Sequence, residues 1–167
     1  MSALPPPRRL ITGHTASGAP DIKDDVLVPS LLPAGFAVTE AFTQEQFLIT
    51  PQQAAEGADI KVERMPLAGG ILVRYLDLPP GFDGTMHFCN RLDYLVILSG
   101  QIELSFHDGS QKSVGPGDLV VQLGNAHQWT NKTDQWARAL AIILPLKEPV
   151  KIDGKGLGQA LGIVERH

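Results

Sequence analysis

Two short stretches of the chain hold most of its reactive side chains. The first, Met86 to Gly100, places His87, Cys89 and Asp93 within seven residues and then continues into an apolar segment. The second carries Gln122, Gly124, His127, Trp129 and Asn131. Imidazole nitrogen and carboxylate oxygen are ligands of divalent metal ions. Two imidazoles with one carboxylate suit non-haem iron(II), and equally zinc, manganese or nickel, and leave positions open for substrate or water.

The spacing within each stretch predicts which side chains share a face. Successive residues of a strand point to opposite sides, so His87 and Cys89 point the same way if the backbone there is extended. Asp93 has the same parity. A barrel interior is lined by alternate residues of each strand. Four residues of the second stretch are candidates for that same interior: Gln122, His127, Trp129 and Asn131.

Several of these residues also have an explanation that involves no ligand. Cys89 can be a small buried apolar residue, because free cysteine often behaves as one. Asp93 can cap a turn or pair with Arg91. Trp129 can be a packing residue. Arg74 can pair with a substrate carboxylate. We expect it instead to be a surface arginine on a strand.

The segments that must position these side chains are short and separated by turn residues. Strands bounded by Gly, Asp and Asn at regular spacing indicate an antiparallel sandwich or barrel. Within the first of them, alternate residues from Leu72 to Leu78 share one face. The predicted strands are Gly70–Leu78, Asp93–Leu98, Gln101–His107, Lys112–Val114, Asp118–Gln122, Gln128–Asn131 and Trp136–Leu144.

Weaker patterns lie on either side of this region. They predict strands at Arg8–Thr12, Asp21–Val28 and Gly35–Phe42, a helical turn at Pro51–Gly57 and a short helix at Gln159–Glu165. The expected organisation is an N-terminal tail with a strand or hairpin over residues 1–34, a barrel over 35–148 and a C-terminal extension over 149–167. Exposed sheet edges need cover, so a homodimer is expected, with the N-terminal segment packing on the partner subunit.

Composition limits the possible partners. The net charge of −4 argues against nucleic acid, because a phosphate-binding surface needs a basic excess. No stretch approaches the roughly 18 apolar residues of a membrane span. A single cysteine cannot form an intramolecular disulfide, and the first ten residues lack the apolar run of a signal peptide. We expect a cytoplasmic protein that acts on a small molecule.

The spacing of both stretches resembles the two motifs of the cupin superfamily, small jelly-roll barrels. The first motif is Gly-x5-His-x-His-x3–4-Glu-x6-Gly, matched here by Gly81, His87 and Gly100, with Cys89 and Asp93 in place of its second His and its Glu. The second is Gly-x5-Pro-x-Gly-x2-His-x3-Asn. Gly124, His127 and Asn131 match it, Gln122 takes the proline position, and the loop after Gly117 is one residue short. The chain further resembles a subgroup of small single-domain cupins.

This resemblance implies an all-β fold, a cupin-type jelly-roll barrel of antiparallel strands with minor helical segments. It places His87, Asp93 and His127 at the ligand positions of a divalent metal ion (Fe, Zn, Mn or Ni), with Cys89, Gln122 and Trp129 lining the pocket. The function to expect is binding of that metal and a small organic molecule, with oxygenase-like, isomerase or decarboxylase chemistry. The alternative is a metal-free binding module or a vestigial cupin without catalysis.

Overall fold

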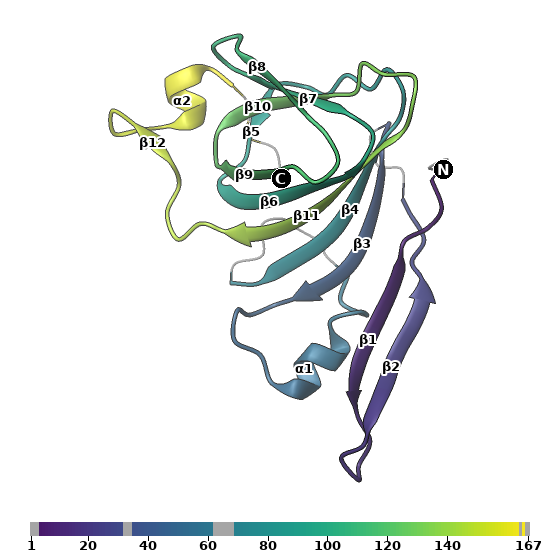
Figure 1. Cartoon of the computed structure of the whole chain (residues 1–167). Coiled ribbons are helices and arrows are strands. Elements are labelled where there is room, and N and C mark those ends of the chain that lie inside the picture. The colour runs from purple at the N-terminus through teal and green to yellow at the C-terminus, as the bar shows by residue number, and fades with distance from the viewer. Residues whose placement is uncertain (1–3, 32–34, 62–68, 164, 166–167) are drawn as a thin grey trace.

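The structure is a computed structural model that describes residues 4–31, 35–61, 69–163 and 165. Most of its elements are antiparallel strands (Figure 1). The strands are β1 Arg8–His14, β2 Pro20–Leu27, β3 Ala37–Gln44, β4 Ile71–Leu78, β5 His87–Phe88, β6 Arg91–Ser99, β7 Ile102–Phe106, β8 Gln111–Val114, β9 Leu119–Leu123, β10 Ala126–Thr130, β11 Ala137–Pro145, β12 Lys151–Ile152 and β13 Lys155–Gly156. The helices are α1 Pro51–Glu56 and α2 Leu157–Leu161.

Two antiparallel sheets form the barrel. One has the strand order β3-β4-β11-β6-β9 and the other β5-β10-β7-β8. Neighbouring strands come from distant parts of the chain, as in a jelly roll, and the strands curve around a common interior (Figure 1). The predicted fold class is therefore confirmed, and each strand predicted after residue 69 is present within a few residues of its expected bounds.

The interior is formed by alternate residues of these strands. The predicted inward face of β4 is confirmed, because Leu72 is buried in the core and Leu76 and Leu78 line the barrel cavity. On the adjacent β11, Ala139 and Ala141 point into the same cavity. Small side chains at these positions leave volume between the sheets that larger residues would fill.

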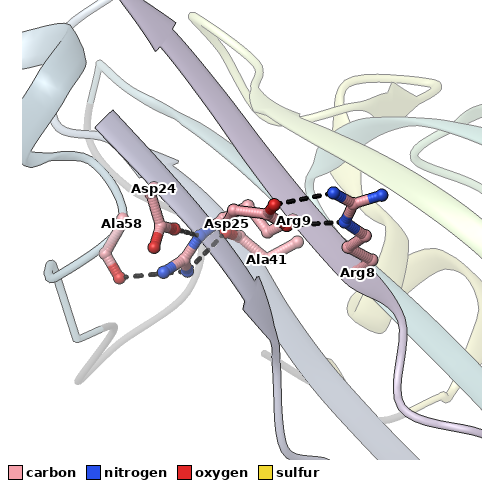
Figure 2. Close-up of polar contacts among 6 residues, drawn as sticks. All are labelled: Arg8, Arg9, Asp24, Asp25, Ala41 and Ala58. Carbon is pink, nitrogen blue, oxygen red and sulfur yellow. Dashed lines mark hydrogen bonds and ion pairs between the residues drawn. The ribbon is translucent and has the colours of Figure 1, made fainter. Parts of the chain in front are cut away.

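The N-terminal hairpin extends away from the barrel beside α1 (Figure 1). β1 and β2 pair along their whole length, which confirms the predicted hairpin. Figure 2 shows how it is attached: Arg9 donates from Nη1 to the carbonyl oxygens of Ala41 on β3 and Ala58, at 3.0 and 3.4 Å, and pairs with Asp24 on β2. One half-buried arginine thus connects the hairpin to the five-stranded sheet.

The C-terminal segment differs from its prediction. The helix predicted at Gln159–Glu165 begins earlier and ends at Leu161. Gly162 follows in the left-handed conformation, with φ of 66°, and its N–H donates to the carbonyl of Gly158. Glycine adopts this conformation without steric cost, and it stops the helix there. Among the described residues, no helix is long and apolar enough to cross a bilayer.

The homodimer stays a prediction. β9 lies at the edge of the five-stranded sheet. Its outward side chains Leu119, Val121 and Leu123 are 58%, 48% and 61% exposed. An exposed apolar edge strand is prone to pairing with another chain. We expect sedimentation at micromolar concentration to give the mass of two chains, and a monodisperse monomer would contradict this.

A buried ion pair on the outer face of the sheet predicts a large effect on stability. Arg138 on β11 donates from Nε and Nη2 to both carboxylate oxygens of Asp77 on β4, each at 2.6 Å, and Asp77 is only 1% exposed. Replacing Asp77 with Ala leaves the guanidinium uncompensated, so the free energy of unfolding should fall by about 3 kcal/mol in urea denaturation.

The control for this variant is Asp25→Ala. Asp25 forms a similar two-point contact with Arg8, but on the exposed hairpin (Figure 2). Exposed pairs contribute little, so this variant should unfold close to the wild-type urea midpoint. If the free energy of unfolding fell equally in both variants, burial would not explain how much the Asp77–Arg138 ion pair contributes to stability.

Candidate functional site

The candidate site is a cavity of about 510 Å³ between the two sheets of the barrel. One part of its wall is apolar and aromatic, and the other part carries polar and charged side chains. The apolar residues include Phe36, Val38, Leu76, Leu78, Phe82, Leu95, Ile97, Ile102 and Trp129; the polar ones include Glu40, Arg74, His87, Cys89, Arg91, Asp93, Gln122 and His127. Such a cavity suits a small organic molecule held by its apolar part and oriented by its polar part.

Two histidines face each other at the polar end. His87 on β5 and His127 on β10 are register partners, and their ring centroids lie 4.5 Å apart. The Nδ1 atom of His87 lies 2.8 Å from the carbonyl oxygen of Thr85, and that of His127 lies 2.9 Å from the carbonyl oxygen of Asn125. A carbonyl only accepts, so both Nδ1 atoms donate, and in a neutral ring Nε2 then carries the lone pair.

This arrangement is typical of histidines that bind metals, whose second nitrogen is held by a backbone carbonyl or a carboxylate. His127 is 2% exposed, and burial lowers its pKa to about 4. The ring is therefore neutral at neutral pH, as a metal ligand must be. A tight turn brings it into place, because Gly124 between β9 and β10 adopts a φ of 49°.

Asp93 provides the carboxylate. It lies on β6 and is 4% exposed, and Arg91 Nε donates to its Oδ2 at 2.9 Å. Burial raises the pKa of Asp93, while Arg91, Arg74 and His87 act against that shift. Its second oxygen, Oδ1, is buried and accepts no hydrogen bond from any described residue.

Gln122 lies directly opposite Asp93, in register on the neighbouring strand β9. Its amide nitrogen is 2.9 Å from Nε2 of His127 and donates to it. The amide oxygen, Oε1, is buried and has no hydrogen-bond partner in the described part of the chain. Two unsatisfied oxygen acceptors, from Asp93 and Gln122, therefore lie on paired residues that line the same cavity.

All six residues that the sequence assigned to the site line this one cavity: His87, Asp93, His127, Cys89, Gln122 and Trp129. The prediction for Asn131 was wrong. Its amide donates to the carbonyl oxygens of Leu78 and Gln135, and its own oxygen accepts from Thr133. Asn131 is fully buried beside the cavity and fixes the loop that follows β10.

The surface position expected for Arg74 was also wrong. Its side chain is only 12% exposed, lines the cavity and lies 3.5 Å from Glu40 on β3. Sequence reasoning missed Glu40 and assigned Arg91 only as a partner of Asp93. The signal for Arg74 was present, since it shares the parity of Leu72, Leu76 and Leu78 on β4.

Within residues 4–31, 35–61, 69–163 and 165, no group of three or more His, Cys, Asp or Glu side chains is arranged so that it could hold a metal ion. The two histidines and Asp93 thus do not form a closed site alone. Their donor chemistry fits, because two Nε2 atoms and the unsatisfied Oδ1 of Asp93 belong to one cavity, and Oε1 of Gln122 adds a further oxygen.

Comparison with known proteins gives both relatives and a matching fold. The phomopsin biosynthesis cluster protein C' of Diaporthe leptostromiformis is 33% identical over 168 residues, which covers 94% of this chain and 87% of that protein. A cupin-domain-containing oxidoreductase of Neurospora crassa is 28% identical over 162 residues, covering 93% of this chain and 82% of that protein.

Among solved structures, the cupin domain of Schizosaccharomyces pombe Cnp3 superposes with a TM-score of 0.53 at 11% identity, over 93% of this chain and 94% of that one, so the likeness concerns the fold alone. No family model matches the chain. The relatives, the barrel and the two motifs agree, and the chain belongs to the cupin superfamily.

Proposed function

We propose that this cupin binds one divalent metal ion at the polar end of its cavity and a small organic molecule against the apolar wall, and that it catalyses an oxygenase-like reaction in small-molecule biosynthesis. The observation that supports this most directly is the orientation of His87 and His127. Each has its Nδ1 held by a backbone carbonyl, so that in the neutral ring Nε2 carries the lone pair, and the unsatisfied Oδ1 of Asp93 belongs to the same cavity.

His87, Asp93 and His127 would hold the ion. When bound, it would supply Lewis acidity toward a carbonyl or enol oxygen, or redox chemistry if it is iron. Arg91 opposes the rise that burial causes in the pKa of Asp93, and it engages Oδ2 while Oδ1 has no hydrogen-bond partner among the described residues. Trp129 packs against the aliphatic core cluster around Leu95, and this apolar wall would contact the organic molecule. Isomerase and decarboxylase chemistry use the same Lewis acidity and remain within the proposal.

The two relatives support the biosynthetic part of the proposal by their names, one a biosynthesis cluster protein and the other a cupin-domain-containing oxidoreductase. The proposal places the protein in the cytoplasm, in keeping with its single cysteine, Cys89, which cannot form an intramolecular disulfide. Its substrate is a small molecule rather than a nucleic acid, because the polar end of the cavity is enclosed and the chain is acidic overall.

A second candidate function is a binding module without metal. It is favoured by one contact, the hydrogen bond from Gln122 to Nε2 of His127, which occupies the lone pair that a metal would use. In this alternative the histidines and Gln122 form a fixed polar network that orients a ligand by hydrogen bonds. Metal content separates the two candidates.

We expect wild-type protein, purified without chelator or a nickel affinity tag, to hold or take up about one divalent ion per chain. His87→Ala and His127→Ala should each abolish this binding, because each removes one nitrogen of the proposed site. Elemental analysis measures the content, before and after reconstitution with iron(II) or zinc.

The matched control is His107→Ala, which removes an exposed histidine in the turn after β7 and should leave metal content unchanged. Less than about a tenth of an equivalent in reconstituted wild-type protein would contradict metal binding and favour the binding module. Full occupancy in His87→Ala would show that the ligands are other residues.

Cys89 is left out of the proposed ligands. It is 3% exposed, and burial raises the pKa of its thiol to about 11, so in the metal-free protein the thiolate is scarce at neutral pH. In metal-free folded protein at pH 8, Cys89 should react with a disulfide reagent such as dithionitrobenzoate on the order of 100-fold more slowly than in urea. A folded-state rate equal to the unfolded rate would show an accessible thiolate instead.

A further inference from the structure

We propose that Gln122 is a further ligand of the metal centre and that its amide turns over when the ion binds, exchanging a hydrogen bond to His127 for contact between Oε1 and the metal. The inference rests on the proposed function and adds a residue to it. In the metal-free protein the Gln122 amide donates to the lone pair of His127 Nε2, where the metal would bind. When the metal binds, the same side chain would become one of its ligands.

The first observation is the unsatisfied oxygen of Gln122. The residue is 4% exposed, and Oε1 is buried without a hydrogen-bond partner among the described residues. Leaving a buried acceptor unsatisfied is unfavourable, because the atom has lost its hydrogen bonds to water, so such atoms call for an explanation. A ligand that supplies positive charge or hydrogen-bond donors would remove this cost.

The second observation is the position of Gln122 opposite another unsatisfied acceptor. Gln122 on β9 is the register partner of Asp93 on β6, and Oδ1 of Asp93 is also buried and unsatisfied. Side chains of directly opposed residues stand about 5 Å apart at Cβ and can reach a common point. A cation bound to Oδ1 of Asp93 and Nε2 of His127 would therefore lie within reach of the Gln122 side chain, and the turnover directs its oxygen toward that cation.

The third observation fixes the orientation of the amide in the metal-free state. His127 donates from Nδ1 to the carbonyl of Asn125, so Nε2 is an acceptor. Gln122 must therefore present its N–H₂ group to the ring, and its oxygen points away from it. The tautomer of His127 dictates this arrangement.

Turning the amide over places its oxygen where the nitrogen now lies, 2.9 Å from Nε2 of His127. Two acceptors at this distance repel unless a cation binds both. Two ligands that lie about 2.1 Å from a metal and at right angles to each other are about 3 Å apart, close to the present spacing, but the metal takes the line of the Nε2 lone pair at which the amide N–H now points. The turnover requires rotation about the last side-chain torsion, which is broad and roughly two-fold, and a shift of the amide away from that line.

The test uses full-length protein stripped of metal by a chelator and titrated with Co²⁺, followed by its visible absorption and by calorimetry. Gln122→Leu should weaken Co²⁺ binding at least about tenfold. Gln122→Glu should bind Co²⁺ at least as tightly as wild type, because it presents an anionic oxygen at the same position. Gln111→Leu, the same change on the exposed strand β8, is the matched control and should bind like wild type.

A measurement on the wild-type protein does not depend on how the variants fold. The side-chain amide of Gln122, assigned by its loss in the Gln122→Glu spectrum, should shift in a ¹H–¹⁵N NMR spectrum when Zn²⁺ is added, as the hydrogen bond to His127 is lost. An amide resonance that stays in place at saturating Zn²⁺ would overturn the inference.

The outcomes separate the inference from the proposed function. If wild type binds Co²⁺ and Gln122→Leu binds it equally or more tightly, the inference is wrong, and Gln122 only obstructs His127. If wild type binds no Co²⁺ or Zn²⁺ after stripping, the proposed metal centre itself is wrong and the inference falls with it.

Discussion

The cavity depends on an arrangement that is unfavourable on its own, an ion pair inside a barrel with apolar walls. The side chains of Arg91 and Asp93 are 12% and 6% exposed. Removing a charge from water costs several kcal/mol, which a partner offsets only with good geometry. Here the partner is two residues away on the same strand, where side chains point to the same face. β6 thus carries both members of the pair into the cavity at once.

The other polar contacts follow from the register around this pair. β9 places Gln122 opposite Asp93, the turn at Gly124 returns the chain, and β10 brings His127 back to Gln122 and to His87 on β5. A side chain at Gly124 would meet Val150 at 2.8 Å, so the turn is tight as well as left-handed. The site is assembled by two strand pairings and one turn.

Much of this was accessible from the sequence, because period-two patterns and spaced glycines are local signals. Gly100 shows why a glycine is needed at such a position. It has a φ of 73°, and a Cβ there would lie 2.7 Å from Ala137 on β11. The same parity that assigned Leu72 and Leu76 to the interior applied to Arg74, yet the charge of Arg74 led to a surface prediction. Burial of a charge becomes understandable only once Glu40, more than thirty residues away, is seen as its register partner on β3.

The contacts of Asn131 and Gln122 could not be predicted from the sequence, for a different reason. Both are amides in the second motif, and spacing alone does not say whether an amide satisfies its own loop or faces the cavity. Asn131 has partners for its nitrogen and its oxygen within the barrel. Gln122 has one for its nitrogen only. That difference depends on how three strands meet, which no local pattern encodes.

Charge balance links the metal centre to the kind of molecule that the cavity accepts. Two arginines in the cavity, Arg74 and Arg91, are paired with two acidic residues, Glu40 and Asp93. The buried His127 is neutral. A divalent ion adds two positive charges to a site that is already balanced, and low polarity makes such an excess costly.

An anionic organic molecule would reduce that excess, and the structure has a group to receive it. Nη1 of Arg91 is a buried donor without a hydrogen-bond partner in the described residues, while Nε of the same guanidinium is engaged by Asp93. A carboxylate or enolate that binds there lies beside the proposed ion, with its apolar remainder toward Trp129 and Leu95. Under the proposed function, metal and substrate would therefore bind more strongly together than apart, because each compensates the charge of the other.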